Sequence, residues 1–130
     1  MVTAVVMVGA AGGKSEPVAW VQGARRAATR DLLALLARQP GVERIILATP
    51  EAEGLADGSV DRVLHTAPGA IHTGETLARL VAEEEIRRLL YLGGGAAPLL
   101  SERALGEIVA ALGSAERLVV TNNQFSSDWA

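Results

Sequence analysis

The sequence predicts an α/β protein whose mainly parallel sheet carries helices on both faces, in three layers and doubly wound. Short apolar runs alternate with longer segments whose apolar residues recur at helical spacing. A strand, a helix and a second strand form a right-handed crossover, which makes the two strands parallel. The 130 residues, 49% of them hydrophobic, suffice for one core, so we expect a single domain over 1–130.

Five segments have the composition of strands, and the longer ones are almost wholly apolar, as strands buried on both faces are. The small and polar residues 50–60 form the expected loop between the second and the third strand. The expected strands comprise residues 2–8 (VTAVVMV), 42–49 (VERIILAT), 61–65 (DRVLH), 88–93 (RLLYLG) and 117–121 (RLVVT).

Three helices are expected between these strands, because apolar residues three and four positions apart share one side of a helix. Cap residues and stop signals set their ends. The first helix covers 24–38 and stops at Pro40 and Gly41, the second has Thr73 as N-cap and the run 83–85 (EEE) as its solvated end, and the third is capped by Ser101 and stops at Gly113.

Composition excludes several classes of function. The formal net charge of −3 includes no basic stripe, and the few aromatic residues are scattered, so nucleic acid is not an expected partner. The chain has no cysteine and no apolar run long enough to span a bilayer, so we expect neither a disulfide framework nor a membrane partner. No charged and then apolar leader precedes the first strand, and the expected location is cytoplasmic.

The stretch VVMVGAAGGKSEP (5–17) leads from the first strand into a glycine turn that ends in Lys14 and Ser15. Lys14 is the single lysine of the chain, beside eleven arginines. Backbone amides of a glycine loop together with a cation form a cradle for phosphate. The predicted phosphate-binding residues are Gly9, Gly12, Gly13, Lys14 and Ser15.

Spacing separates this loop from two known phosphate motifs. A Walker A loop has four residues between its first glycine and the Gly-Lys-Ser, whereas only three lie between Gly9 and Gly13. The dinucleotide fingerprint needs Gly-x-Gly-x-x-Gly and an acidic residue at the end of the second strand, which here ends in Ala48, Thr49 and Pro50. No redox cofactor is therefore expected. The plain alternative is that the glycines only make a tight turn.

Two further loops are expected at the same carboxyl edge, where open α/β sheets bind ligands. Gly93, Gly94 and Gly95 lack a Cβ and so allow a ligand to approach the backbone, unless they form a plain turn. The segment TNNQFSSDW (121–129) places short polar side chains after the fifth strand, although it equally suits a polar chain end. His65 and His72 are alternative ligand contacts, without the further residues that a metal set needs.

The order of elements and two of the loops resemble the nucleotidyltransferase family of the molybdenum-cofactor guanylyltransferase type. MVGAAGGKS (7–15) is similar to its opening glycine loop, and GGGAAPLLS (93–101) to its later motif before a capped helix. Gly23 with ARRAATRDLLALL and the strand IILATPE (45–51) are similar to the segments between them. The resemblance implies a Rossmann-like fold of the nucleotide-diphospho-sugar transferase type, with magnesium and a nucleoside triphosphate as cofactors.

The sequence departs from the family at positions that matter for catalysis. Gly94, Gly95 or Ala96 stands where the family aspartate holds magnesium, and Ser15, Glu16 and Pro17 replace the family Pro-Lys. The chain resembles the first two thirds of the family domain. Either the native chain continues beyond Ala130, or a second copy completes the sheet or the pocket, so a homodimer is among the expected partners.

The leading hypothesis is a domain of this type that binds a nucleotide or nucleotide-sugar, with catalysis reduced or lost. Its alternatives are a non-catalytic interaction or scaffold domain and a small kinase or NTPase. In the leading hypothesis Lys14 contacts phosphate, Gly93–Gly95 line the base or sugar, Asn122 and Asn123 close the far side, and Asp128 is the substitute metal ligand.

Overall fold

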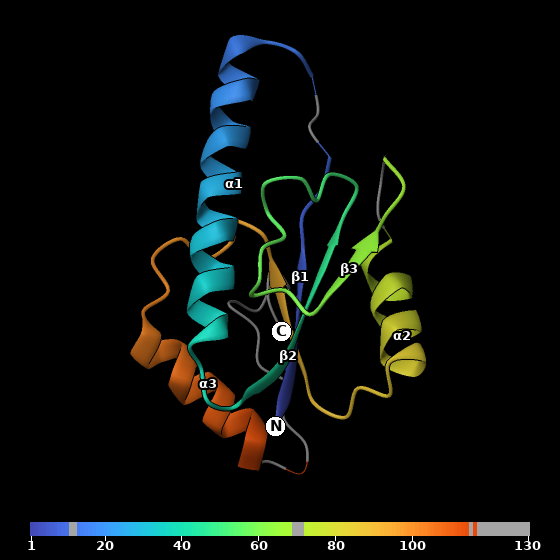
Figure 1. Ribbon diagram of the computed structural model, residues 1–130, viewed down its shortest axis with the longest axis vertical. Helices are drawn as coiled ribbons and strands as arrows, with labels where there is room; N and C mark the ends of the chain where they lie inside the picture. Colours follow the sequence, from blue (N-terminus) through green and yellow to red (C-terminus); the bar gives the residue numbers. More distant parts are fainter. Residues whose placement is uncertain (11–12, 69–71, 115, 117–130) are drawn as a thin grey trace.

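The computed structural model describes residues 1–10, 13–68, 72–114 and 116, in which strands and helices alternate (Figure 1). The predicted α/β class with a parallel sheet is confirmed, since four strands form one sheet in the order β3-β2-β1-β4 and all its pairs are parallel. The predicted fifth strand, 117–121, lies outside the described residues. The elements are β1 (Val2–Met7), α1 (Glu16–Ala37), β2 (Val42–Thr49), β3 (Arg62–His65), α2 (Thr73–Glu83), β4 (Leu89–Gly93) and α3 (Glu102–Ser114).

Helices cover both faces of the sheet, because successive side chains of a strand point to opposite sides. This alternation is visible in β1, where Ala4 and Val6 join a core cluster with α1 and α3, while Val5 and Met7 join a second cluster with α2. Figure 1 shows α1 and α3 on one side of the sheet and α2 on the other. No described helix has the length and apolar character needed to cross a membrane.

The direction in which successive strands are added to the sheet reverses beside β1. From β1 the chain passes through α1 to β2 and on to β3, and it then returns through α2 to β4 on the opposite side of β1. The strand order therefore reverses between β1 and β4, and open α/β sheets bind ligands outside the carboxyl ends of the strands at such a point.

Helix α1 begins at Glu16, and the prediction of a start at residue 24 is wrong. The periodicity indicated only the part that packs on the sheet, where Thr29, Leu32, Leu33 and Leu36 are buried. Residues 16–24 have no such apolar side facing the sheet, and they extend α1 beyond the ends of the strands (Figure 1). Ser15 as N-cap and the proline in the first turn are ordinary start signals for this longer helix.

The loop between β2 and β3 is held by side chains of α1. Its buried Leu55 joins the core that α1 covers. Within the loop, the Ser59 hydroxyl and N–H donate to Asp57, and these hydrogen bonds lower the pKa of that carboxyl. Arg26 donates to the backbone oxygens of Glu51 (3.2 Å) and Glu53, and Arg30 donates to that of Gly54 (3.5 Å).

The interpretation of residues 83–85 as a solvated helix end is wrong for Glu84. Its side chain is only 9% exposed and lies between two arginines of neighbouring strands. Arg44 approaches its carboxylate to 3.0 Å and also donates to its backbone oxygen at 2.9 Å, and Arg62 forms an ion pair with the other carboxylate oxygen. Glu84 therefore ties the end of α2 to β2 and β3, a contact that a run of three acids does not reveal.

We predict that Glu84→Gln lowers the free energy of unfolding by about 1–2 kcal/mol, because both arginines lose their anionic partner. The matched control is Glu83→Gln, whose exposed pair with Arg79 spans 3.9 Å and is worth less than about 0.5 kcal/mol. Urea denaturation of the three proteins gives the comparison. Equal losses in the two variants would contradict the bridging role.

Candidate functional site

A cavity of about 540 Å³ opens at the carboxyl edge of the sheet, where β1 and β4 end. This is where the strand order reverses, the position at which open α/β sheets bind ligands. The volume falls in the roughly 300–1,000 Å³ range of small-molecule pockets. We call it the edge cavity, and the described residues that line it are Met7, Arg25, Thr73, Tyr91, Gly93, Gly94, Gly95 and Ala96.

Arg25 is the cation of the edge cavity. It lies one turn before Thr29 on the side of α1 that packs on the sheet, so the helix carries it to the edge where β4 ends. Its guanidinium makes no hydrogen bond or ion pair with any residue that the structure describes. The side chain therefore offers its whole fork of N–H donors to a ligand.

The first turn of α2 meets the same cavity through Thr73. The N-cap residue is His72, and the prediction of Thr73 as N-cap is wrong by one residue. His72 forms no side-chain hydrogen bond to the helix, so no side chain of the cap satisfies the first N–H groups of α2. The exposed Glu75 is the acidic residue of this turn and is not part of the cavity lining. Free N–H groups and the positive end of the helix dipole both attract an anion.

The predicted glycines 93–95 line the edge cavity, and two of them are also required by packing. A Cβ on Gly94 would lie 2.5 Å from Val8 Cγ2 and 2.7 Å from Thr29 Oγ1. Gly95 has a φ of +81°, and a Cβ there would lie 3.3 Å from Arg25 Cγ. The same lack of side chains that lets the turn after β4 approach α1 leaves one wall of the cavity as bare backbone.

The predicted phosphate loop is divided between two places. Gly9 lines a smaller cavity of about 80 Å³ that shares Arg25 and Gly94 with the larger one. Lys14 and Ser15 line neither of these cavities. Ten residues separate Ser15 from Arg25, and a helical rise of 1.5 Å per residue places the start of α1 roughly 15 Å beyond the cavity. The structure thus does not bring Lys14 together with Gly93–Gly95.

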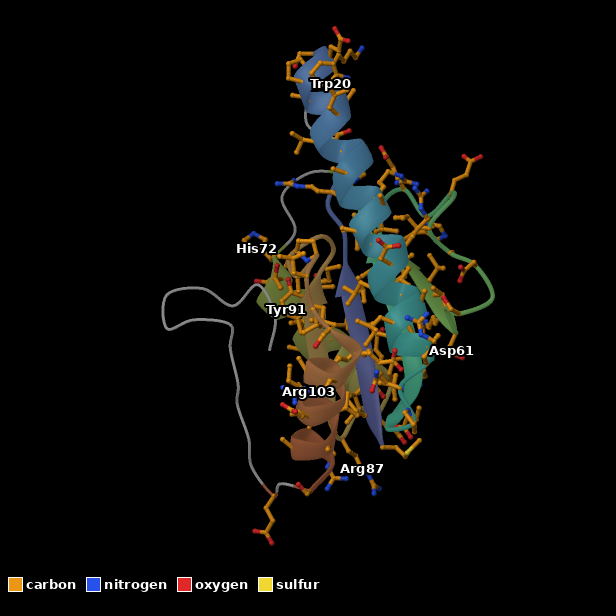
Figure 2. The ribbon with its side chains drawn as sticks, turned by 90° about the vertical axis from the view of Figure 1, so that its left-hand side faces the viewer. Trp20, Asp61, His72, Arg87, Tyr91 and Arg103 are labelled. Atoms are coloured by element: carbon orange, nitrogen blue, oxygen red, sulfur yellow. The ribbon has the colours of Figure 1, made fainter. Side chains whose placement is uncertain are left out.

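The start of α1 is also a poor place for a phosphate on chemical grounds. Pro17 in its first turn has no N–H to donate, and Glu16 adds a negative charge. Gly13 has a φ of +91°, so its left-handed backbone is explained by the turn itself. Figure 2 shows Trp20, near this end of α1, far from Tyr91 of the edge cavity.

Several predicted site residues have no place in this description. Gly12, Asn122, Asn123 and Asp128 lie outside the described residues. In the part of the chain that the structure describes, no three His, Asp or Glu side chains gather into a metal site. The cavity lining contains no carboxylate among its described residues, so these residues do not supply direct ligands for magnesium.

Sequence reasoning missed Arg25, Thr73 and Tyr91 as site residues. Nothing in the spacing distinguishes Arg25 from the other arginines until the register of α1 on the sheet is known. One signal was present, because positions 25, 29, 32 and 36 recur at helical spacing and place Arg25 at the end of the buried side of the helix. The scarcity of lysine directed the interpretation to Lys14 instead.

Comparison of the chain with known proteins gave no match, either to a family model or to a curated sequence. The functional argument therefore depends on the geometry of the edge cavity. Three features carry it: Arg25, which has no partner among the described residues, the first turn of α2, and the bare backbone of the glycines.

The contacts of Gly94 predict that Gly94→Ala destabilises the fold by about 1–3 kcal/mol, because neither the buried Val8 nor Thr29 can withdraw without moving backbone. Gly23→Ala is the matched control. Gly23 lies within α1 with nothing within 4 Å of the added Cβ, so alanine there stabilises by about 0.5–1 kcal/mol. Opposite signs in urea denaturation are expected, and a neutral Gly94→Ala would contradict the packing role.

Proposed function

We propose that the protein binds a nucleotide or nucleotide-sugar in the edge cavity, as a divergent nucleotidyltransferase-like domain. One observation carries the proposal: an arginine without a partner in the described part of the chain and the N-terminus of a helix meet at one cavity beside the reversal of strand order. Each of these features favours an anion, and a phosphate is the anion that such positions in open α/β sheets accommodate.

The phosphate and the nucleoside or sugar of the ligand would contact different residues of the cavity. Phosphate oxygens would accept hydrogen bonds from Arg25 and from the first N–H groups of α2, and the planar guanidinium supports two parallel bonds. The glycine backbone would allow these oxygens to approach without a side chain in the way. Met7 and Tyr91 would supply apolar surface for the nucleoside or sugar.

The proposal covers binding and does not include transfer of a nucleotidyl group. Such a transfer requires that the charge developing on the phosphate be neutralised, usually by a metal ion. The described lining has Arg25 as a cation and no carboxylate that would hold a metal. Recognition of a phosphorylated ligand is the chemistry that these residues support.

One observation favours a second candidate function, a non-catalytic interaction domain. The steric role of Gly94 and the left-handed backbone of Gly95 explain the glycine run without any ligand. In this alternative Arg25 is a solvated surface cation, and the edge cavity binds no phosphate.

Isothermal titration separates the two functions. GTP, CTP, ATP and inorganic pyrophosphate are titrated into the protein with and without magnesium. We predict that Arg25→Gln weakens binding of the preferred nucleotide by about 10- to 100-fold, as expected for loss of charge-assisted hydrogen bonds worth about 1.5–3 kcal/mol. Arg103→Gln is the matched control, since this arginine lies on α3, is 88% exposed and pairs with Glu107 of its own helix.

Lys14→Ala tests the site first expected from the sequence. Loss of affinity in Lys14→Ala with none in Arg25→Gln would move the phosphate to the start of α1. No heat from any of the four ligands would leave the interaction domain as the better description.

A further inference from the structure

A second hollow lies along α1, and it shares no lining residue with the edge cavity. It has a volume of about 180 Å³ and lies between this helix and the segment that leads into α3. Six of its eight lining residues are apolar, and the other two, Asp31 and Arg38, are charged residues of α1. We call it the α1 groove, and its lining residues are Ala28, Asp31, Leu32, Leu35, Arg38, Ala97, Pro98 and Leu100.

Leu99 stands out beside the α1 groove. It is 94% exposed, although both of its neighbours in the chain, Pro98 and Leu100, line the groove. An exposed apolar side chain therefore comes between two lining residues of the groove along the chain. A two-fold contact between identical chains needs a surface that is complementary to its own copy, and an exposed side chain next to a hollow can meet this condition.

The two charged residues of the α1 groove can pair with the same two residues of a second copy related by a two-fold axis. Asp31 and Arg38 are seven residues apart, so they lie on the same side of α1, separated by two turns or roughly 10 Å. Neither side chain forms an ion pair with another residue among those described. When two copies of α1 run antiparallel about an axis midway between these positions, Asp31 of each chain faces Arg38 of the other.

We propose that the α1 groove binds a second copy of this chain, with Leu99 of each copy seated against the groove of the other and two Asp31–Arg38 ion pairs at its ends. An unrelated partner would not require the two charges to mirror each other. The contact is small, so roughly micromolar affinity is expected. The edge cavity and the α1 groove have no lining residue in common, so this proposal does not depend on the proposed function.

Charge reversal gives a sharp test by sedimentation velocity from about 1 µM to 1 mM protein. Asp31→Arg puts arginine at both positions of the chain, and Arg38→Asp puts aspartate at both, so each variant alone repels its own copy. In an equimolar mixture the two variants face each other with opposite charges at both ends. We expect the dimer Kd of each variant alone to be raised at least about tenfold, and the mixture to dimerise at the lower concentrations at which the wild type does.

Two further variants locate the contact. Leu99→Glu is expected to raise the Kd of the dimer at least about 100-fold, because it replaces an apolar contact in the interface with a charge that must lose its water. Trp20→Glu is the matched control, since Trp20 is 68% exposed on the same helix but lies outside the α1 groove. A wild-type protein that is monomeric at 1 mM, a dimer lost only in Trp20→Glu, or a mixture that stays monomeric would overturn the proposal.

Discussion

The close approach of Gly94 and Gly95, directly after β4, to α1 determines where Arg25 and the glycine backbone lie in the candidate site. Gly94 fits against Val8 and Thr29 with no room for a Cβ, and its N–H donates to the backbone oxygen of Met7 at 2.7 Å. These contacts fix the level at which α1 crosses the sheet edge. Since Arg25 lies one helical turn from Thr29, the same packing holds the base of its side chain beside the ends of β1 and β4.

This constraint explains why the edge cavity is polar in character although the sheet below it is apolar. Below the edge, side chains of Val6, Leu47 and Leu92 fill the space between strands and helices. Above it the strands end in Met7 and Gly93, and backbone groups together with the start of α2 replace those side chains. Unsatisfied donors are tolerated there because water reaches them, and an anion would replace that water.

Sequence patterns predicted the four described strands to within one residue, because apolar composition and strand burial have the same physical origin. The same signal failed for residues 16–24, since an exposed helix segment leaves no apolar period to detect. It also failed for Glu84, whose arginine partners lie on two other strands and become neighbours only through the register of the sheet. Gly93–Gly95 were predicted to line the site. The sequence did not reveal that Gly94 must lack a Cβ, because that constraint comes from Thr29 of α1 and from Val8, which become its neighbours only in the fold.

The arginines show how position outweighs rarity in choosing a candidate binding residue. Arg26 and Arg30 donate to backbone oxygens, Arg44 and Arg62 pair with Glu84, and Arg79 and Arg103 pair within their own helices. Arg25 and Arg38 differ from these because each lines a hollow and lacks a partner among the described residues. Arg87 lines neither hollow and lies toward the opposite end of the molecule from Trp20 in Figure 2.

An unpaired cation gains most from a ligand where a cavity excludes part of the solvent, because charge interactions strengthen as the local dielectric falls. The same criterion therefore selects Arg25 for a small anion and Arg38 for the carboxylate of a second chain.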